Sequence, residues 1–467
     1  MSSTPANSPH LAADNYASSK WSLRYFHVYI CCLLTLACPA DKLHYLLPVI
    51  YLAAIFFTNR DYVFIRVVTV SGIVLCITAL SLLIDCFRGH EVNLPGAVIA
   101  VIGYSFLFIA LAERPDIRMS DRDYQNIVAL TAWFVIIQSL IGFVQFGLSG
   151  GESDAVAGTF GILDFRQGQY TFGQVFCSLC LSGMVLFLLL EYRRPLAAVA
   201  ITAGLLAFIL AQATHQIGLY IIAIGTVVML QYRSLKSFAF TVTLAAVILL
   251  LVLYIYPGTI DDGIGWYRKT FQMSKSPKLI ILEDTGKVVR DIKNVLLGTG
   301  IGQFTSRGAL ITTGSYISVD LPDLFVATSD YYDNHVQSAM RIYEEVGEGS
   351  AISKPYFSLL TIPVEYGVIQ ASLIALFLAM HFRLNLRLSR SPHPQVAATG
   401  VFANIGVLYL VLLCMVENYA EFCHALLVPF ALYLVAVSRA IQTQTSGKEG
   451  TSDRPRTMDE TRTVDAP

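Results

Sequence analysis

Long runs of apolar residues, separated by short polar stretches, make up most of the chain. Nine such runs precede one polar segment of about a hundred residues, and three follow it. A helix needs about 20 apolar residues to cross the ~30 Å hydrocarbon core of a bilayer. The pattern predicts an all-α, polytopic membrane protein with about twelve transmembrane helices, at 25–38, 43–58, 63–84, 97–112, 126–148, 171–190, 195–211, 216–231, 237–256, 357–381, 396–415 and 422–437.

Composition supports the membrane class. Apolar residues make up 55% of the chain and charged residues 14%, whereas about a quarter of a soluble domain is charged. Only helices and closed barrels satisfy their backbone polar groups in lipid, and these runs lack the alternation typical of barrel strands. The net charge of −1 gives no reason to expect a nucleic-acid partner.

The distribution of Lys and Arg predicts the topology. Cytoplasmic loops carry an excess of both residues close to the spans. If the N-terminus is cytoplasmic, the short outer loops hold only Lys42, Arg88 and Arg166. The inner loops then hold Lys20, Arg24, Arg60, Arg114, Arg118, Arg122, Arg193, Arg194, Arg233, Lys236, Arg383, Arg387, Arg390 and Arg439. We expect both termini in the cytoplasm and the long polar segment outside.

Five parts of the chain follow from these boundaries. Residues 1–22 and 439–467 are polar and poor in bulky apolar residues, which predicts disordered cytoplasmic tails. Residues 23–256 hold the first nine transmembrane helices, and 357–438 hold the last three. Residues 257–356 form a large, mostly helical outer loop.

The outer loop changes charge along its length. Basic residues prevail between 268 and 293, and acidic residues prevail between 320 and 348. Basic side chains can hold phosphate oxygens, and an acidic side chain can accept the proton of a sugar hydroxyl. A pair of solvated amphipathic helices with compensating charges is the alternative interpretation. The spacing of Asp320, Asp323, Asp330 and Asp333 matches no specific metal loop, so no metal and no cofactor are expected.

A glycine-rich turn follows an amphipathic stretch in this loop. Gly298, Gly300 and Gly302 alternate with other residues between Leu297 and Phe304. A strand before the turn and a helix after it would indicate a nucleotide cradle, but the turn follows a helix. The residues therefore predict a tight turn that returns the chain toward the membrane.

Several short motifs resemble the O-antigen polymerase and O-antigen ligase superfamily of bacterial envelope glycosyltransferases. The run Leu297-Gly298-Thr299-Gly300-Ile301-Gly302-Gln303-Phe304 is similar to a turn in the large periplasmic loop of that family. Glu365-Tyr366-Gly367 resembles its Glu-x-Gly signature, and Gly158-Thr159-Phe160 a third element. Twelve spans, with the main loop between the ninth and tenth, also look like the family layout. The resemblance covers roughly residues 158–376.

This resemblance implies a multi-pass protein of the bacterial inner membrane. The implied reaction takes place at the periplasmic face. Its substrates are oligosaccharide repeat units linked to undecaprenyl diphosphate, and it polymerises them into O-antigen or exopolysaccharide. The implied partners are this lipid-linked donor, a glycan acceptor, membrane lipids, a chain-length regulator and a flippase. The expected site is covered by the helical loop and lies in a lateral cleft open to lipid, because the polyprenyl tail stays in the bilayer.

Candidate residues follow from this chemistry. A lipid diphosphate leaving group needs fixed cations where no metal is present. Arg166 and Arg290 are the first candidates for binding the diphosphate, followed by Arg268, Arg307 and Lys354. The acceptor hydroxyl needs a general base, for which the candidates are His335, Asp333 and Glu365. Four more residues near the outer interface are expected to line the same cleft or to contact lipid headgroups: His215, Glu417, Glu421 and His424.

Two departures from the family pattern favour a polymerase over a ligase. Ligases carry a His-Asn element before the Glu-x-Gly signature, where this chain has Lys354-Pro355-Tyr356. Many members begin the eighth span with a Ser-Arg pair, where this chain has Thr214-His215. A ligase that transfers glycan to a lipid A core remains the alternative, and a transporter of lipid-linked sugar or polysaccharide is the alternative from another class.

Overall fold

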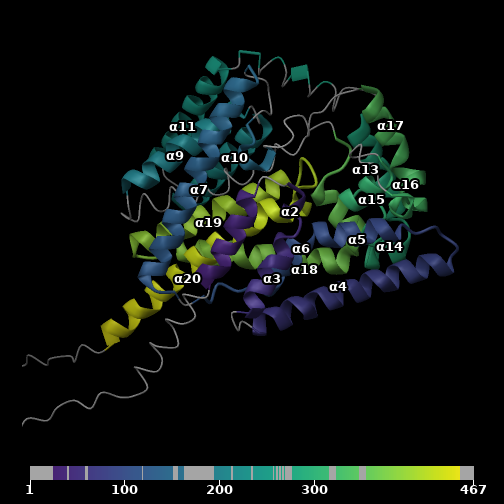
Figure 1. The fold of residues 1–467 in the computed structure, drawn as a ribbon, viewed down its shortest axis with the longest axis horizontal. Coiled ribbons are helices and arrows are strands. Elements are labelled where there is room, and N and C mark those ends of the chain that lie inside the picture. The colour runs from purple at the N-terminus through teal and green to yellow at the C-terminus, as the bar shows by residue number, and fades with distance from the viewer. Residues whose placement is uncertain are drawn as a thin grey trace, which may run out of the picture.

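The computed structural model describes residues 25–38, 41–57, 61–117, 119–150, 156–161, 194–211, 214–232, 235–255, a few positions between 257 and 268, 276–314, 322–346 and 354–452. All regular structure in these residues is helical (Figure 1). The expected all-α fold is therefore confirmed for the described part of the chain.

Most helices follow the apolar runs. A helix over Tyr25–Ala37 comes first. We keep the name outer segment for residues 257–356, after their predicted location. The other helices before this segment are α2 (Asp41–His44), α3 (Leu47–Phe57), α4 (Asp61–Phe87), α5 (Leu94–Gly103), α6 (Ser105–Ala112), α7 (Asp121–Leu148), η1 (Gly158–Gly161), α9 (Arg194–Leu210), α10 (Thr214–Tyr232) and α11 (Leu235–Ile255). Those after it are α18 (Ser358–Leu388), α19 (Pro394–Leu413), η5 (Tyr419–Glu421) and α20 (Cys423–Ser452).

Five of these helices are long and apolar enough to cross a bilayer, within α4, α7, α18, α19 and α20. A sixth is added if α5 and α6, which are bent by 48° at Tyr104, form one broken span. Four shorter apolar helices accompany them. The chain is therefore a helical membrane protein by the length and composition of its helices.

The helix bounds differ from the predicted spans in informative ways. The predicted span 97–112 is two helices, and the predicted span 43–58 is divided between α2 and α3. Helices α4, α7 and α18 run several residues beyond their apolar cores because polar residues extend their ends. The predicted span 171–190 lies outside the described residues.

Buried tyrosines tie the membrane helices together. Tyr29 shares a 2.6 Å hydrogen bond with Thr131 of α7, and Tyr51 donates one of 2.7 Å to Glu113. Lipid tails are as apolar as leucine, so helices in a bilayer associate through close packing and polar contacts more than through the hydrophobic effect. These tyrosines supply close packing and polar contacts in the largest apolar core of the described residues.

The outer segment folds into short helices gathered at one end of the helical body (Figure 1). They are α13 (Pro277–Val288), α14 (Ile292–Leu297), α15 (Arg307–Thr312), η4 (Asp323–Phe325), α16 (Asp330–His335) and α17 (Gln337–Val346). Helices α13, α16 and α17 pack on one another around Ile281, Val336 and Met340. Helices α14 and α15 instead pack against α18 and α5.

Helix α14 buries its polar residues and exposes its apolar ones. Lys293 and Asn294 face inward, whereas Ile292 is 68% exposed. Lys293 Nζ contacts Asp85 of α4 at 2.5 Å, and both side chains are buried. A helix with this reversed polarity is suited to an apolar surrounding, which fits its position against α4 and α18.

Candidate functional site

Glu365 anchors the glycine-rich turn. It lies in α18 and is fully buried. Its carboxylate accepts hydrogen bonds from the backbone N–H groups of Gly302, Phe304 and Ser306 at 2.8 to 2.9 Å. Its carbonyl oxygen accepts another from Gly300. Glu365 therefore holds the turn against α18, and its carboxylate oxygens face amides rather than an open cleft.

The turn requires glycine at its closest approaches. Gly298 and Gly302 have φ of +78° and +82°, a conformation that L side chains rarely adopt. A Cβ on Gly298 would lie 2.2 Å from the Glu365 carbonyl oxygen, and one on Gly302 would lie 2.3 Å from the amide nitrogen of Ala97. The turn therefore fits between α5 and α18 only with glycines at these positions.

Two cations meet at Glu417, between α19 and η5. Arg307 Nη2 lies 3.1 Å from Glu417 Oε1, and Lys354 Nζ lies 3.0 Å from the same oxygen. Burial alone would raise the pKa of Glu417, but the charges of Lys354 and Arg307 outweigh it and lower the pKa to about 2. Glu417 is thus an ionised counter-charge at the ends of the membrane helices.

Lys278, at the start of α13, is a third cation beside this pair. Its Nζ donates to the carbonyl oxygen of Val416 at 2.9 Å and lies 5.3 Å from the centre of the Phe357 ring. Burial, together with the charge of Lys354, lowers the pKa of Lys278 to about 8 against the attraction of Glu417. We call Lys278, Arg307, Lys354 and Glu417 the cationic cluster.

Glu421 adds little negative charge to this cluster at neutral pH. Its Oε2 accepts the backbone N–H of Arg307 at 2.8 Å. Burial, together with the nearby Glu365, raises the pKa of Glu421 to about 8. The guanidinium of Arg307 also stacks on Phe422, 3.1 Å from the ring centre. Among the described residues, three cations therefore lie near one ionised carboxylate, a balance of charge that suits an anionic ligand.

His215, at the start of α10, faces the cluster from another side. It is half-buried and lies within electrostatic range of Glu417, Lys354 and Lys278. Its Nε2 is 3.3 Å from the hydroxyl oxygen of Tyr419, to which Gln216 donates a bond of 2.9 Å. An imidazole at this position is a candidate proton acceptor.

The structure brings some of the predicted residues together and separates others. Arg307 and Lys354 meet in the cationic cluster. Arg290 is exposed in the turn between α13 and α14, and Arg268 is exposed elsewhere in the outer segment. Arg166 and His424 were also predicted: Arg166 lies outside the described residues, as does the side chain of His424.

His335 and Asp333 lie on α16 and interact with groups that do not belong to the cationic cluster. Asp333 accepts a 2.7 Å bond from the Thr328 hydroxyl on the exposed side of the helix. Burial lowers the pKa of His335, whose charged neighbours are Asp284 and Lys287 of α13. Neither side chain has a contact with the cationic cluster in the described part of the chain.

Lys278 was missed as an individual site residue. In the sequence it is one of several lysines in a basic stretch. Its only distinguishing signal is the preceding Ser276-Pro277 pair, which marks the beginning of a helix. Its contact with Val416 joins positions 138 residues apart, and no sequence pattern indicates it.

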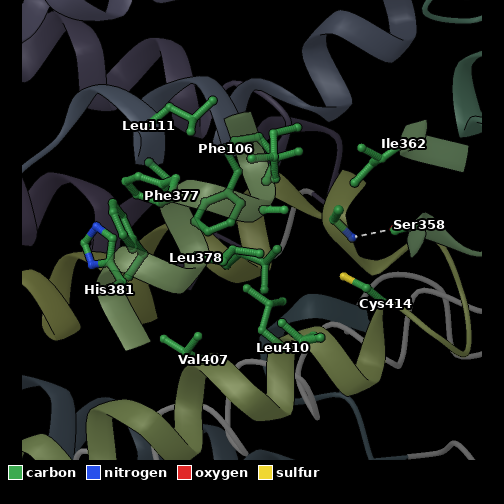
Figure 2. A pocket seen from close by; sticks show the side chains of 18 of the residues that line it. Phe106, Leu111, Ser358, Ile362, Phe377, Leu378, His381, Val407, Leu410 and Cys414 are labelled. Carbon is green, nitrogen blue, oxygen red and sulfur yellow. Dashed lines mark hydrogen bonds between the residues drawn. The ribbon is translucent and has the colours of Figure 1, made fainter. Parts of the chain in front are cut away.

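An apolar cavity of about 710 Å³ lies among the membrane helices (Figure 2). Helices α6, α18, α19 and α20 line it, with Phe106, Phe377 and Leu410 among its walls. Ser358 and Cys414 lie at one end and His381 at the other (Figure 2). The backbone N–H of Ser358 donates to the Glu417 carbonyl oxygen, so this end of the cavity adjoins the cluster.

No family model matches the chain, and no curated protein matches it either. Among the described residues, no three His, Cys, Asp or Glu side chains form a group that could hold a metal ion.

Proposed function

We propose that the chain is a membrane glycosyltransferase that polymerises oligosaccharide units carried on a polyprenyl diphosphate. In this proposal it crosses the bacterial inner membrane about twelve times and works at the periplasmic face. The observation that carries the proposal is the cationic cluster, in which the Glu417 carbonyl oxygen accepts a hydrogen bond from the backbone N–H of Ser358 in the lining of an apolar cavity. A lipid diphosphate needs this combination, because its head is anionic and its tail is apolar.

The reaction assigns a role to each part of the cluster. The acceptor hydroxyl oxygen attacks the anomeric carbon of the donor sugar, and the bond from that carbon to the diphosphate oxygen breaks. Lys278 and Lys354 neutralise the negative charge that develops on the leaving diphosphate, while Arg307 fixes Glu417 and Phe422 around them. The hydroxyl proton passes to a base.

His215 is the base that we assign. It lies within electrostatic range of both lysines, whereas His335 and Asp333 contact other groups and Glu365 binds backbone amides. The neutral imidazole is the form that accepts a proton.

The test uses purified protein with a polyprenyl-diphosphate-linked oligosaccharide, alone and with a lipid A core acceptor, and separates the products by size. A ladder from the donor alone supports a polymerase, and a single product that requires the core acceptor indicates a ligase. Donor that crosses vesicle membranes without reaction would replace the proposal with a transporter.

Matched variants connect the activity to the cluster. Lys354→Ala and Lys278→Ala should each lower the transfer rate by roughly 10²-fold, as the loss of one charge-stabilising group does elsewhere. Lys287→Ala is the control, because Lys287 is an exposed lysine on α13 that pairs with Asp284 outside the cluster. Equal activity in all three variants would remove the cluster from the mechanism.

A further inference from the structure

Helix α14 lies beside the last turns of α4, which is one of the helices long and apolar enough to cross a bilayer (Figure 1). At the beginning of α14, Asp291 pairs with Arg88, the residue that follows α4. At its end, the Gly298 carbonyl oxygen accepts a 2.7 Å hydrogen bond from the Ser81 hydroxyl. Helix α14 therefore runs antiparallel to α4, from the end of α4 toward its middle.

The glycine-rich turn continues in the same direction. Ser81 precedes the end of α4 by six residues, and a helix rises ~1.5 Å per residue, so α14 ends about 9 Å along α4. Beyond it, Ile301 packs in one buried cluster with Val74 and Tyr104. Val74 lies near the middle of the apolar helix in α4, and Tyr104 lies at the break between α5 and α6. The turn thus lies at the depth of the spans.

The backbone of the turn is satisfied by α18. Non-helical backbone at membrane depth is stable only where protein groups or a water-filled cavity satisfy its polar groups. The N–H of Thr299 donates to the Val364 carbonyl oxygen at 2.9 Å, and that of Gly300 donates to the Glu365 carbonyl oxygen at 3.1 Å. The Glu365 carboxylate accepts three further N–H groups of the turn and the residues after it. The turn is therefore compatible with an apolar surrounding.

The polar side chains of α14 face the protein and have partners there. Lys293 Nζ lies 2.5 Å from a carboxylate oxygen of Asp85, and the Tyr331 hydroxyl donates to the Asn294 side chain at 3.0 Å. Ionisable residues inside a membrane protein almost always face the interior of the helix bundle and pair with one another. A short helix on a water-exposed surface has no need to bury its lysine.

The apolar side chains of α14 face outward. Ile292 is 68% exposed and Leu296, one turn later, is 42% exposed. Their surface is continuous with α18, because Val295 lines the same apolar cavity as Leu359 and Val368 of that helix. Helix α18 contains one of the apolar membrane-spanning helices. Lipid that surrounds α18 would therefore also cover this face of α14.

Exposed charge lies at the beginning of α14, at the end of α4. Arg88 pairs with Asp291 there, and Arg290 is exposed beside them. Arginine side chains at the ends of membrane helices extend to the lipid headgroups. Within α14 itself the one charged residue is the buried Lys293. One end of the helix is thus suited to headgroups and the rest of its surface to acyl chains.

We propose that α14 is a re-entrant helix that enters the bilayer with the glycine-rich turn and presents Ile292 and Leu296 to lipid acyl chains. The acyl chains belong to the leaflet nearest the outer segment. The inference goes beyond the proposed function and does not depend on it, because it rests on the contacts of α14 and the turn with α4, α5 and α18. Part of the segment that the sequence predicts to lie outside the membrane then lies within it.

The first test places p-benzoylphenylalanine at position 292 of the full chain in nanodiscs and detects lipid adducts by mass spectrometry after irradiation. The photo-reactive residue in place of Leu376, an exposed residue of α18, is the lipid-facing control. Its use in place of Glu345, an exposed residue of α17, is the solvent control. Position 292 should give as much lipid adduct as position 376 and roughly tenfold more than position 345, because acyl chains do not extend into water.

Two results of this test would overturn the inference. One is a lipid yield at position 292 as low as that at position 345, which would place α14 in water. The other is a cross-link from position 292 to a second copy of the chain or to another protein in place of lipid, which would make this face a protein interface.

The second test measures depth with lipids brominated near the headgroup or near the chain end. Ile292→Trp and Leu296→Trp are compared after the fluorescence of the unaltered protein is subtracted. Leu296→Trp should be quenched relatively more by the deep bromine than Ile292→Trp, because the end of α14 lies beside Ser81 and its beginning beside Arg88. Folded variants that neither bromine quenches, or a reversed order of depth, would contradict the re-entrant course.

Discussion

Arg307 and Lys354 contact the same carboxylate oxygen, Glu417 Oε1, at 3.1 Å and 3.0 Å. The two cations come from different parts of the outer segment, and Glu417 lies between α19 and η5. One buried carboxylate therefore fixes two parts of the outer segment to the ends of the membrane helices. It also keeps two positive charges close together, and an anion can bind to such a pair.

Replacing the two cations should have unequal effects on stability. The Arg307 side chain is 8% exposed and that of Lys354 is 20% exposed. Arg307→Ala leaves the buried Glu417 carboxylate with one partner fewer, and we expect the free energy of unfolding to fall by about 3–5 kcal/mol. Lys354→Ala should lower the free energy of unfolding by a clearly smaller amount. Thermal unfolding in detergent, followed by tryptophan fluorescence, checks the order, and a larger loss for Lys354→Ala would contradict it.

The Lys293–Asp85 pair should show strong coupling. Both groups are buried, and the Tyr331 hydroxyl also contacts Asp85 at 3.2 Å. Lys293→Met or Asp85→Asn alone should cost about 3–5 kcal/mol, because each leaves an unpaired buried charge or an unmatched partner. The double variant should lose much less stability than the sum of the losses in the two single variants.

An exposed pair next to the same two helices provides the control for this cycle. Arg88 pairs with Asp291, and both side chains are more than a third exposed. Arg88→Ala should therefore change stability by at most about 1 kcal/mol. Additive losses in the Lys293 and Asp85 cycle would show that the two groups do not depend on each other.

Replacing a glycine of the outer segment by alanine should destabilise the protein by an amount that depends on which glycine is replaced. Gly302→Ala adds an unfavourable φ and a Cβ 2.3 Å from backbone atoms, so we expect a cost of roughly 2–5 kcal/mol. Gly314→Ala shares the positive φ but meets open space, and should cost only about 1–2 kcal/mol. Chemical denaturation of both variants separates strain from steric contact, and equal costs would argue against the close packing.

Anion binding should weaken as the pH rises through about 8. The pKa of Lys278 is lowered to about 8, so Lys278 loses its proton there while arginine would not. Affinity for inorganic pyrophosphate, measured by calorimetry between pH 7 and 9, should fall in the unaltered protein. Lys278→Arg should flatten the profile. Pyrophosphate ionises too, so the difference between the two proteins is the informative quantity.

Glu421 should make stability decline with rising pH. Its pKa is raised from 4.5 to about 8, so the folded state keeps a proton that the unfolded chain releases. This contribution is fully present below pH 4.5 and is lost as the pH rises to about 8. Glu421→Gln should remove that slope. Melting temperatures from pH 5 to 8 provide the check, and parallel curves for both proteins would contradict it.

The sequence by itself determined the helical membrane class and most helix positions. Apolar runs of about 20 residues have few other stable conformations, because lipid offers no partners for backbone polar groups. The glycines at 298, 300 and 302 were also recognisable from their alternation, and Glu365 from the resemblance of Glu365-Tyr366-Gly367 to a family signature. Local pattern was sufficient for the apolar runs and the glycine-rich turn, because each of these is a run of residues that are near one another in the chain.

Only the tertiary structure decided which of these residues meet. Lys278 reaches Val416, and Lys354 reaches Glu417, across more than sixty positions of chain. The sequence ranked Arg290 above Arg307, yet Arg307 is the one that contacts Glu417, because packing of α15 on α5 places it there. Glu365 was a candidate general base in an apolar run, but the fold surrounds its carboxylate with backbone amides. Such contacts depend on how helices pack, and charge and hydropathy along the chain do not encode that packing locally.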